Sequence, residues 1–131
     1  MTEKLFTEAL AGFEMQLTLS RQSQDVLLTL TGGDVPHFGV VTAVGKDGLH
    51  TIALPSRPGH VHQEGVLTET IAKCLQPILP GNAMITGGMH VNNISAEQMH
   101  AAFTMTKHLA QQAREWLVAH PVAIISETFA K

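Results

Sequence analysis

The sequence is poor in cysteine, in clustered positive charge and in long apolar runs. Its single cysteine, Cys74, excludes an internal disulfide and a zinc site built from several cysteines. The 8 basic and 11 acidic residues give a net charge of -3 with no basic cluster, which argues against nucleic-acid binding. No apolar run approaches the roughly 20 residues of a transmembrane helix, and the N-terminus lacks the profile of a signal peptide. These absences predict a cytoplasmic protein with neither a membrane nor a nucleic acid as partner.

The common catalytic motifs are also missing. No Gly-x-Ser-x-Gly frame, dinucleotide fingerprint or phosphate loop with its lysine is present. Cys74 falls on the apolar stripe of a predicted helix, where a thiol is inert. Glu64 and Glu69 are the only carboxylates near the turns that follow the strands, so no acid/base pair is evident. We therefore predict a binding protein with no catalytic residue.

Apolar periodicity predicts one α+β domain over residues 1–131. Alternating apolar and polar residues indicate strands at 13–20, 25–31, 37–44, 49–54 and 83–86, of which the first four form an antiparallel meander. Helical spacing indicates one helix from about residue 63 to the prolines at 77 and 80, and another from 95 to just before Pro121. The apolar stripes of these helices include Val66 and Met99. Residues 122–126 could add a short edge strand or pack against a partner subunit. The order is ββββ-α-β-α, which predicts an antiparallel sheet with two helices packed on one face.

The most informative stretch is residues 87–95, where a strand meets the start of the second helix. Gly88 allows close backbone approach, and the polar residues His90, Asn92 and Asn93 follow it. Ser95 then opens the helix as a capping box with the glutamine three residues further on. The first turn of a helix has unpaired N–H groups and partial positive charge, so this turn is suited to an anion.

Histidine is the unusual residue type, with 8 copies. His37, His60 and His90 each lie where a glycine or proline shapes the chain at the boundary of an element, and such loops often carry function. The other histidines considered are predicted to be structural or solvated: His50, His100, His108 and His120.

Two ligands fit these histidines, and a structural role for them also remains open. His60 and His62, joined by Glu64 or His90, would supply three ligands for zinc or another divalent ion. Alternatively, imidazolium groups, asparagine amides, Arg57 and the two helix N-termini would converge on a phosphate. We favour the anion, while His90 and its neighbouring asparagines could instead satisfy backbone groups at the strand end.

Three short segments resemble one small protein family: residues 36–40 (PHFGV), 58–60 (PGH) and 88–95 (GMHVNNIS). The family is that of the D-type accessory subunits of gallate and hydroxyarylic acid decarboxylases, which are prenylated-flavin chaperones. Its members are similar in fold to proteasome assembly chaperones, a dimeric α+β module. The resemblance implies a flavoprotein that binds reduced prenylated FMN, the product of a flavin prenyltransferase, and delivers it to a prenylated-flavin-dependent aromatic acid decarboxylase.

Taken together, the residues and the resemblance predict a homodimer with a cofactor site. The predicted cofactor-binding residues are His37, Gly39, Arg57, Gly59, His60, Gly88, His90, Asn92, Asn93 and Ser95. Phe38, Met84, Met89 and Ile94 could cover the flavin ring. Two alternatives are a metal-dependent enzyme that uses His60, His62 and His90, and an assembly subunit that binds no ligand.

Overall fold

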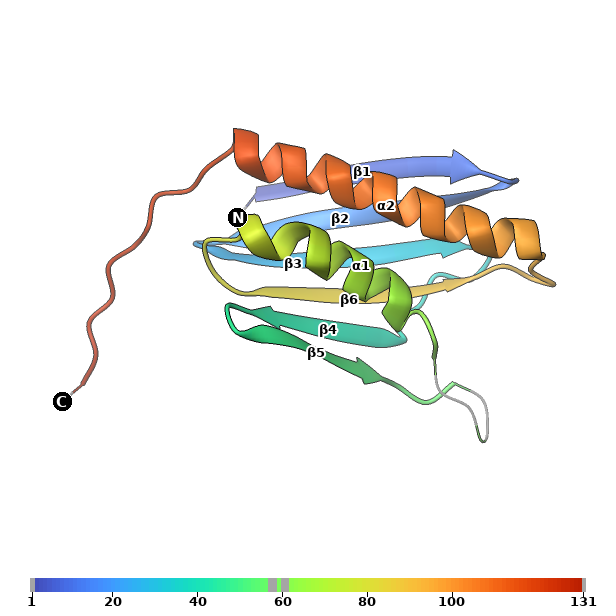
Figure 1. Cartoon of the computed structure of the whole chain (residues 1–131), viewed down its shortest axis with the longest axis horizontal. Helices are drawn as coiled ribbons and strands as arrows, with labels where there is room; N and C mark the ends of the chain where they lie inside the picture. Colours follow the sequence, from blue (N-terminus) through green and yellow to red (C-terminus); the bar gives the residue numbers. More distant parts are fainter. Residues whose placement is uncertain (1, 57–58, 60–61, 131) are drawn as a thin grey trace.

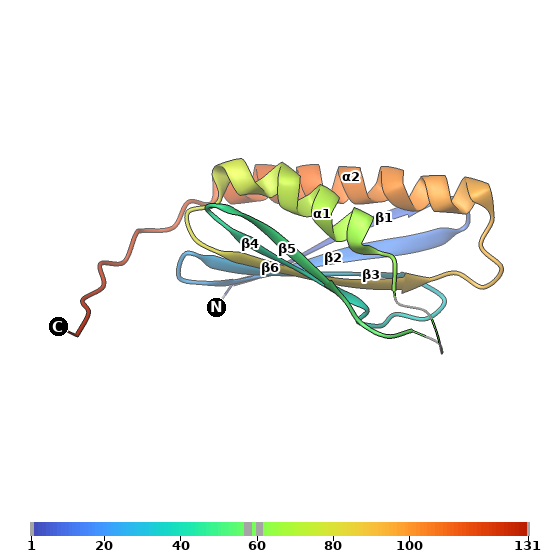
Figure 2. The same ribbon diagram turned by 60° about the horizontal axis from the view of Figure 1, so that its bottom comes forward.

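The computed structural model describes residues 2–56, 59 and 62–130, and within them the chain forms a sheet covered on one face by two helices (Figures 1 and 2). The elements in chain order are β1 Thr2–Leu10, β2 Phe13–Gln22, β3 Asp25–Gly33, β4 Val40–Gly45, β5 Gly48–Ala53, α1 Gly65–Leu75, the short 3-10 helix η1 Gln76–Ile78, β6 Ala83–His90 and α2 Ala96–Ala119. The predicted α+β class, with both helices on one face of a mostly antiparallel sheet, is confirmed.

The order of strands in the sheet is β1-β2-β3-β6-β4-β5. β1, β2 and β3 form an antiparallel meander, and β4 and β5 form a separate hairpin. β6 lies between these two units, parallel to β3 and antiparallel to β4. The first strands therefore do not form one continuous meander, because the last strand of the chain pairs with both units and joins them.

One strand, two strand boundaries and the C-terminal segment differ from those predicted. β1 was not predicted, because Phe6 is the one buried residue among its described side chains and an edge strand of this kind shows no apolar alternation. β4 begins at Val40 rather than at His37, and β6 continues to His90, so its two glycines lie inside the strand. Residues 122–126 form no strand, and the tail extends away from the sheet (Figure 1).

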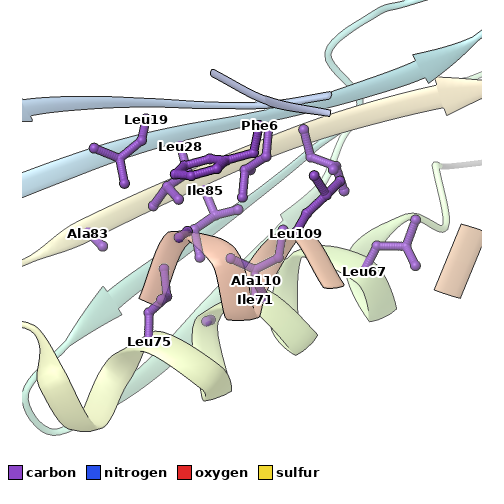
Figure 3. Close-up of a cluster of buried hydrophobic side chains, with 14 of the residues drawn as sticks. Phe6, Leu19, Leu28, Leu67, Ile71, Leu75, Ala83, Ile85, Leu109 and Ala110 are labelled. Carbon is purple, nitrogen blue, oxygen red and sulfur yellow. The ribbon is translucent and has the colours of Figure 1, made fainter. Parts of the chain in front are cut away.

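The hydrophobic core fills the space between the sheet and the helices (Figure 3). β2, β3 and β6 contribute alternate residues to it, β1 and β4 contribute Phe6 and Val44, and α1 and α2 contribute one side each, as the helical spacing predicts. Its fully buried side chains include Leu19, Leu28, Ile71, Ile85 and Leu109. Burial of each such side chain stabilises the fold by about 1.5–3 kcal/mol. Among the described residues, no helix combines the length and the apolar character needed to cross a membrane.

Both helices begin at the same end of the sheet, where β6 ends (Figure 1). At this end two apolar residues from the predicted helical stripes are not buried. Val66 in the first turn of α1 and Met99 in the first turn of α2 are each 61% exposed. The core is therefore closed along most of the helices and open where they begin.

Candidate functional site

The site lies beyond the start of β4, where β6 runs on without that neighbour. Val40, the first residue of β4, is opposite Gly87, so β6 extends three residues past it. The chain that precedes β4 crosses this gap, and the N–H of Gly39 donates to the carbonyl of Gly87 at 2.9 Å. This arrangement brings His37 next to the segment that leads into α1.

Three ionisable side chains, His37, His62 and Glu64, meet at this point, and we call them the histidine–glutamate cluster. His37 Nε2 lies 3.3 Å from His62 Nδ1 and 3.5 Å from Glu64 Oε1. His62 Nδ1 lies 3.6 Å from Glu64 Oε2. The side chains are 24%, 19% and 15% exposed, respectively. Glu64 Oε2 is buried and accepts no hydrogen bond from any described residue, so the cluster is suited to hold a proton or a cation.

Two glycines make room for these histidines. A Cβ at Gly39 would lie 2.5 Å from Cγ of His62. A Cβ at Gly88 would overlap the carbonyl oxygen of His37 and would lie 2.7 Å from its Cδ2. Both glycines were predicted to belong to the site, and in the structure each permits one imidazole to pack directly on backbone.

The turn between β6 and α2 is held by its own hydrogen bonds. His90 Nε2 lies 3.0 Å from Asn92 Oδ1, and the N–H of Asn92 donates to Asp34 Oδ2 at 2.8 Å. The predicted capping box is confirmed: Ser95 Oγ accepts from the N–H of Gln98, and the N–H of Ser95 donates to Gln98 Oε1, both at 3.1 Å. Ser95 is thus used as the cap of its own helix, and the Asp34 carboxylate, which was not predicted here, holds the start of the turn.

Asn93 completes this turn with a φ of 51°, a left-handed conformation that asparagine tolerates better than most residues. Its side chain is exposed and makes no hydrogen bond with the described residues. Asn93 thus has its whole side-chain amide available to an anion, whereas Asn92 uses its Oδ1 in the contact with His90 and keeps only its NH2 group.

An open groove of about 400 Å³ lies between the beginnings of the two helices and the end of β6. Most of its lining is apolar, and Glu64 and His90 also line it. The apolar residues include Val66, Leu67, Met89, Ile94, Met99 and Phe103. Met89 and Ile94 were predicted to cover a flavin ring, and they do line this groove.

The other two residues predicted to cover the ring lie elsewhere. Phe38 is 66% exposed and is not part of the groove lining. Met84 lines a depression of about 450 Å³ that also includes Leu27 and contains none of the predicted cofactor-binding residues.

The loop that was predicted to supply a third part of the site is only partly described. Arg57 and His60 lie outside the described residues. Gly59 has a φ of 79°, in the left-handed region that favours glycine. The predicted metal set of His60 and His62 with Glu64 or His90 is untested as a whole, because it includes His60. Within the described residues, His62 and Glu64 of that set lie together with His37 in the histidine–glutamate cluster.

His62 and Glu64 were not among the predicted cofactor-binding residues. The signal for them is local and weak: a histidine and a glutamate two residues apart, just ahead of a helix. Their partner His37 is 25 residues away from His62 in the sequence, and the sheet order brings it close.

The fold and the groove define a small α+β binding module whose open end is suited to a flat, largely apolar ligand. Comparison with known proteins identifies the class of ligand. A family model described as "Prenylated flavin chaperone LpdD-like domain" matches residues 9–118. The protein LpdD of Lactiplantibacillus plantarum (strain ATCC BAA-793 / NCIMB 8826 / WCFS1) is 41% identical over 118 residues, which cover 89% of this chain and 87% of LpdD. The chain therefore belongs to the LpdD-like prenylated flavin chaperones, and the predicted family is confirmed.

Proposed function

We propose that this protein is a non-catalytic chaperone that binds reduced prenylated FMN and delivers it to a prenylated-flavin-dependent aromatic acid decarboxylase. It would receive the flavin from a flavin prenyltransferase, and it would act as a homodimer in the cytoplasm. The family assignment supports the class of ligand. The reduced state, the decarboxylase partner and the dimer are parts of the proposal.

The groove is the observation that carries the proposal. Its volume of about 400 Å³ lies within the range of roughly 300–1,000 Å³ typical of small-molecule sites. Val66 and Met99 are apolar, exposed and adjacent to the groove, so a bound ring system would cover surface that the fold itself leaves open.

The phosphate of the flavin would lie near the start of α2. Helix N-termini favour anions, and the amide of Asn93 is available there. Asn92 and Ser95 would act mainly by holding the turn, since their N–H groups donate to Asp34 and Gln98. His90 lines the groove, and its Nε2 donates to Asn92 Oδ1, which leaves Nδ1 of the neutral ring as an acceptor for an N–H or O–H group of the flavin.

A charge placed in the groove tests this proposal. Met99→Glu puts a carboxylate among apolar side chains, where it opposes both the ring and the anionic phosphate. Val118→Glu is the matched control, because Val118 is also 61% exposed and lies on the same helix, outside the groove. In anaerobic titrations with reduced prenylated FMN, we expect Met99→Glu to weaken binding about tenfold or more, or about 1.4 kcal/mol, and Val118→Glu to leave it unchanged.

Delivery is tested separately. The flavin-loaded protein should activate an apo-decarboxylase, whereas the loaded protein alone should not decarboxylate gallate or a related acid. Equal affinity in the two glutamate variants would remove the groove as the flavin site. Turnover by the isolated protein would show that it is an enzyme.

A further inference from the structure

We propose that the histidine–glutamate cluster is a binding site for a divalent metal ion of the zinc type. Two imidazole nitrogens and one carboxylate oxygen are a donor set that suits Zn²⁺ and similar borderline ions. All three ligand atoms lie within 4.8 Å of one another. Glu64 also lines the groove, so this site adjoins the proposed flavin site, but metal binding can be measured with no flavin present.

The spacing of the donors matches a tetrahedral ion. Bonds of about 2.0–2.1 Å in tetrahedral geometry place neighbouring ligand atoms about 3.3–3.4 Å apart. His37 Nε2 and His62 Nδ1 are separated by 3.3 Å, Glu64 Oε1 lies 3.5 Å from His37 Nε2, and Glu64 Oε2 lies 3.6 Å from His62 Nδ1. The two nitrogens are thus already at the separation that an ion would require, and one carboxylate oxygen lies within 4.8 Å of both.

The orientation of His37 supports the same conclusion. Its Nδ1 lies 2.9 Å from the carbonyl oxygen of Val35. A carbonyl only accepts, so Nδ1 carries the proton, and in the neutral ring the lone pair is on Nε2, which faces the cluster. A backbone carbonyl that fixes the tautomer of a histidine in this way is a usual feature of metal-binding imidazoles.

Hydrogen bonds within the cluster leave acceptors unsatisfied. A single proton between His37 Nε2 and His62 Nδ1 can serve that pair, whose separation is 3.3 Å. The distances from the imidazoles to Glu64 exceed the usual hydrogen-bond range of about 2.7–3.2 Å. Glu64 Oε2 is buried without a hydrogen-bond partner among the described residues. A cation at the centre would satisfy all three acceptors.

Three protein ligands leave one position of a tetrahedral ion free. Sites of this kind hold water or an exogenous ligand at the open position, in contrast to the closed four-ligand sites of structural zinc. The cluster is partly exposed, so such a ligand has access from solvent. We therefore assign an exchangeable rather than a purely structural ion to this site.

Metal binding by the untagged full-length protein tests the proposal. After removal of metal with a chelator, the protein is titrated with Zn²⁺, and separately with Co²⁺, whose visible absorption reports tetrahedral coordination. We expect one ion per chain, with affinity reduced at least about tenfold in Glu64→Gln and His62→Gln, since even residues that only support a ligand contribute about 10–100-fold. Zn²⁺ should also raise the Tm of the wild type more than that of either variant.

His108→Gln is the matched control. His108 Nδ1 and Glu8 Oε1 form another histidine–glutamate pair, at 3.0 Å, without a third ligand among the described residues. Loss of the His108 imidazole should leave the affinity for Zn²⁺ unchanged. No tetrahedral Co²⁺ spectrum, or equal affinity in the wild type and both cluster variants, would overturn the proposal. Circular dichroism checks the fold of each variant, and either cluster variant alone is sufficient for the comparison.

Discussion

Gly88→Ala is expected to destabilise the protein by forcing apart two segments that the sheet holds together. The new methyl group would overlap the carbonyl oxygen of His37 and would lie 2.7 Å from its carbonyl carbon, where real Cβ atoms are essentially never found. Because the contact is with backbone, no change of side-chain rotamer relieves it, and the chain before β4 must shift. Overpacking of this kind costs about 1–3 kcal/mol.

The unfolded state adds an opposing contribution. Replacing glycine by alanine reduces the conformational freedom of the unfolded chain and stabilises the folded protein by about 0.4–1 kcal/mol at a compatible position. Gly48→Ala measures this contribution alone, because a Cβ at Gly48 has no atom within 4 Å. The free energy of unfolding of Gly88→Ala should thus lie about 1–3 kcal/mol below that of Gly48→Ala.

Urea denaturation gives both values, from the midpoint at unchanged m-value. Thermal unfolding should show a loss of about 3–5 °C in Tm for each kcal/mol in a chain of this length. If the two alanine variants are equally stable, Gly88 and His37 are not in contact. The argument that Gly88 makes room for His37 in the histidine–glutamate cluster would then fail.

Two further substitutions test the fold. Ala11 has a φ of 53° beside Gly12 at 84° in the two-residue turn from β1 to β2. Asparagine tolerates this left-handed conformation better than alanine, so Ala11→Asn should stabilise the protein by about 0.5–1 kcal/mol. A higher urea midpoint is expected, and a lower one would contradict the prediction. Thr42 and Thr68 are fully buried and their hydroxyls lie 2.8 Å apart, and the Thr42 hydroxyl also lies 2.8 Å from that of Thr51. Thr42→Val should therefore destabilise by about 1–3 kcal/mol through the loss of two hydrogen bonds, while Thr68 still donates to the carbonyl of Gly65. Adding Thr68→Val should then have less effect than it has alone, and simple additivity in this double-mutant cycle would count against the bond.

Local patterns were sufficient for most of the fold. Strands β2 and β3 alternate buried and partly buried residues, so their sequence shows period-two patterning directly. The cap of α2 depends on residues three positions apart, Ser95 and Gln98, and for this reason it was predicted with the correct residues. β1 was missed because its stability comes from pairing with β2 and not from its own composition.

The candidate site was predictable only in part, and the family resemblance came from the same short segments that build it. Gly39, Gly88 and His37 were recognised from their sequence setting, and the structure shows that they pack on one another or on His62. Met99 was predicted to be buried because it has helical spacing with apolar neighbours. It is exposed because it lines the open groove between the beginnings of the two helices, which spacing within one helix cannot reveal.

The sequence by itself thus determined the class of fold, the two helices with their limits, and the family to which the chain belongs. These properties depend on residues close together along the chain, through periodicity, capping and short motifs. The tertiary structure decided the central place of β6, the opening between the helix starts, and the meeting of His37 with His62 and Glu64. Each of these depends on which strands pair and in what register, and that choice is made by the free energy of the whole sheet and core rather than by any one segment.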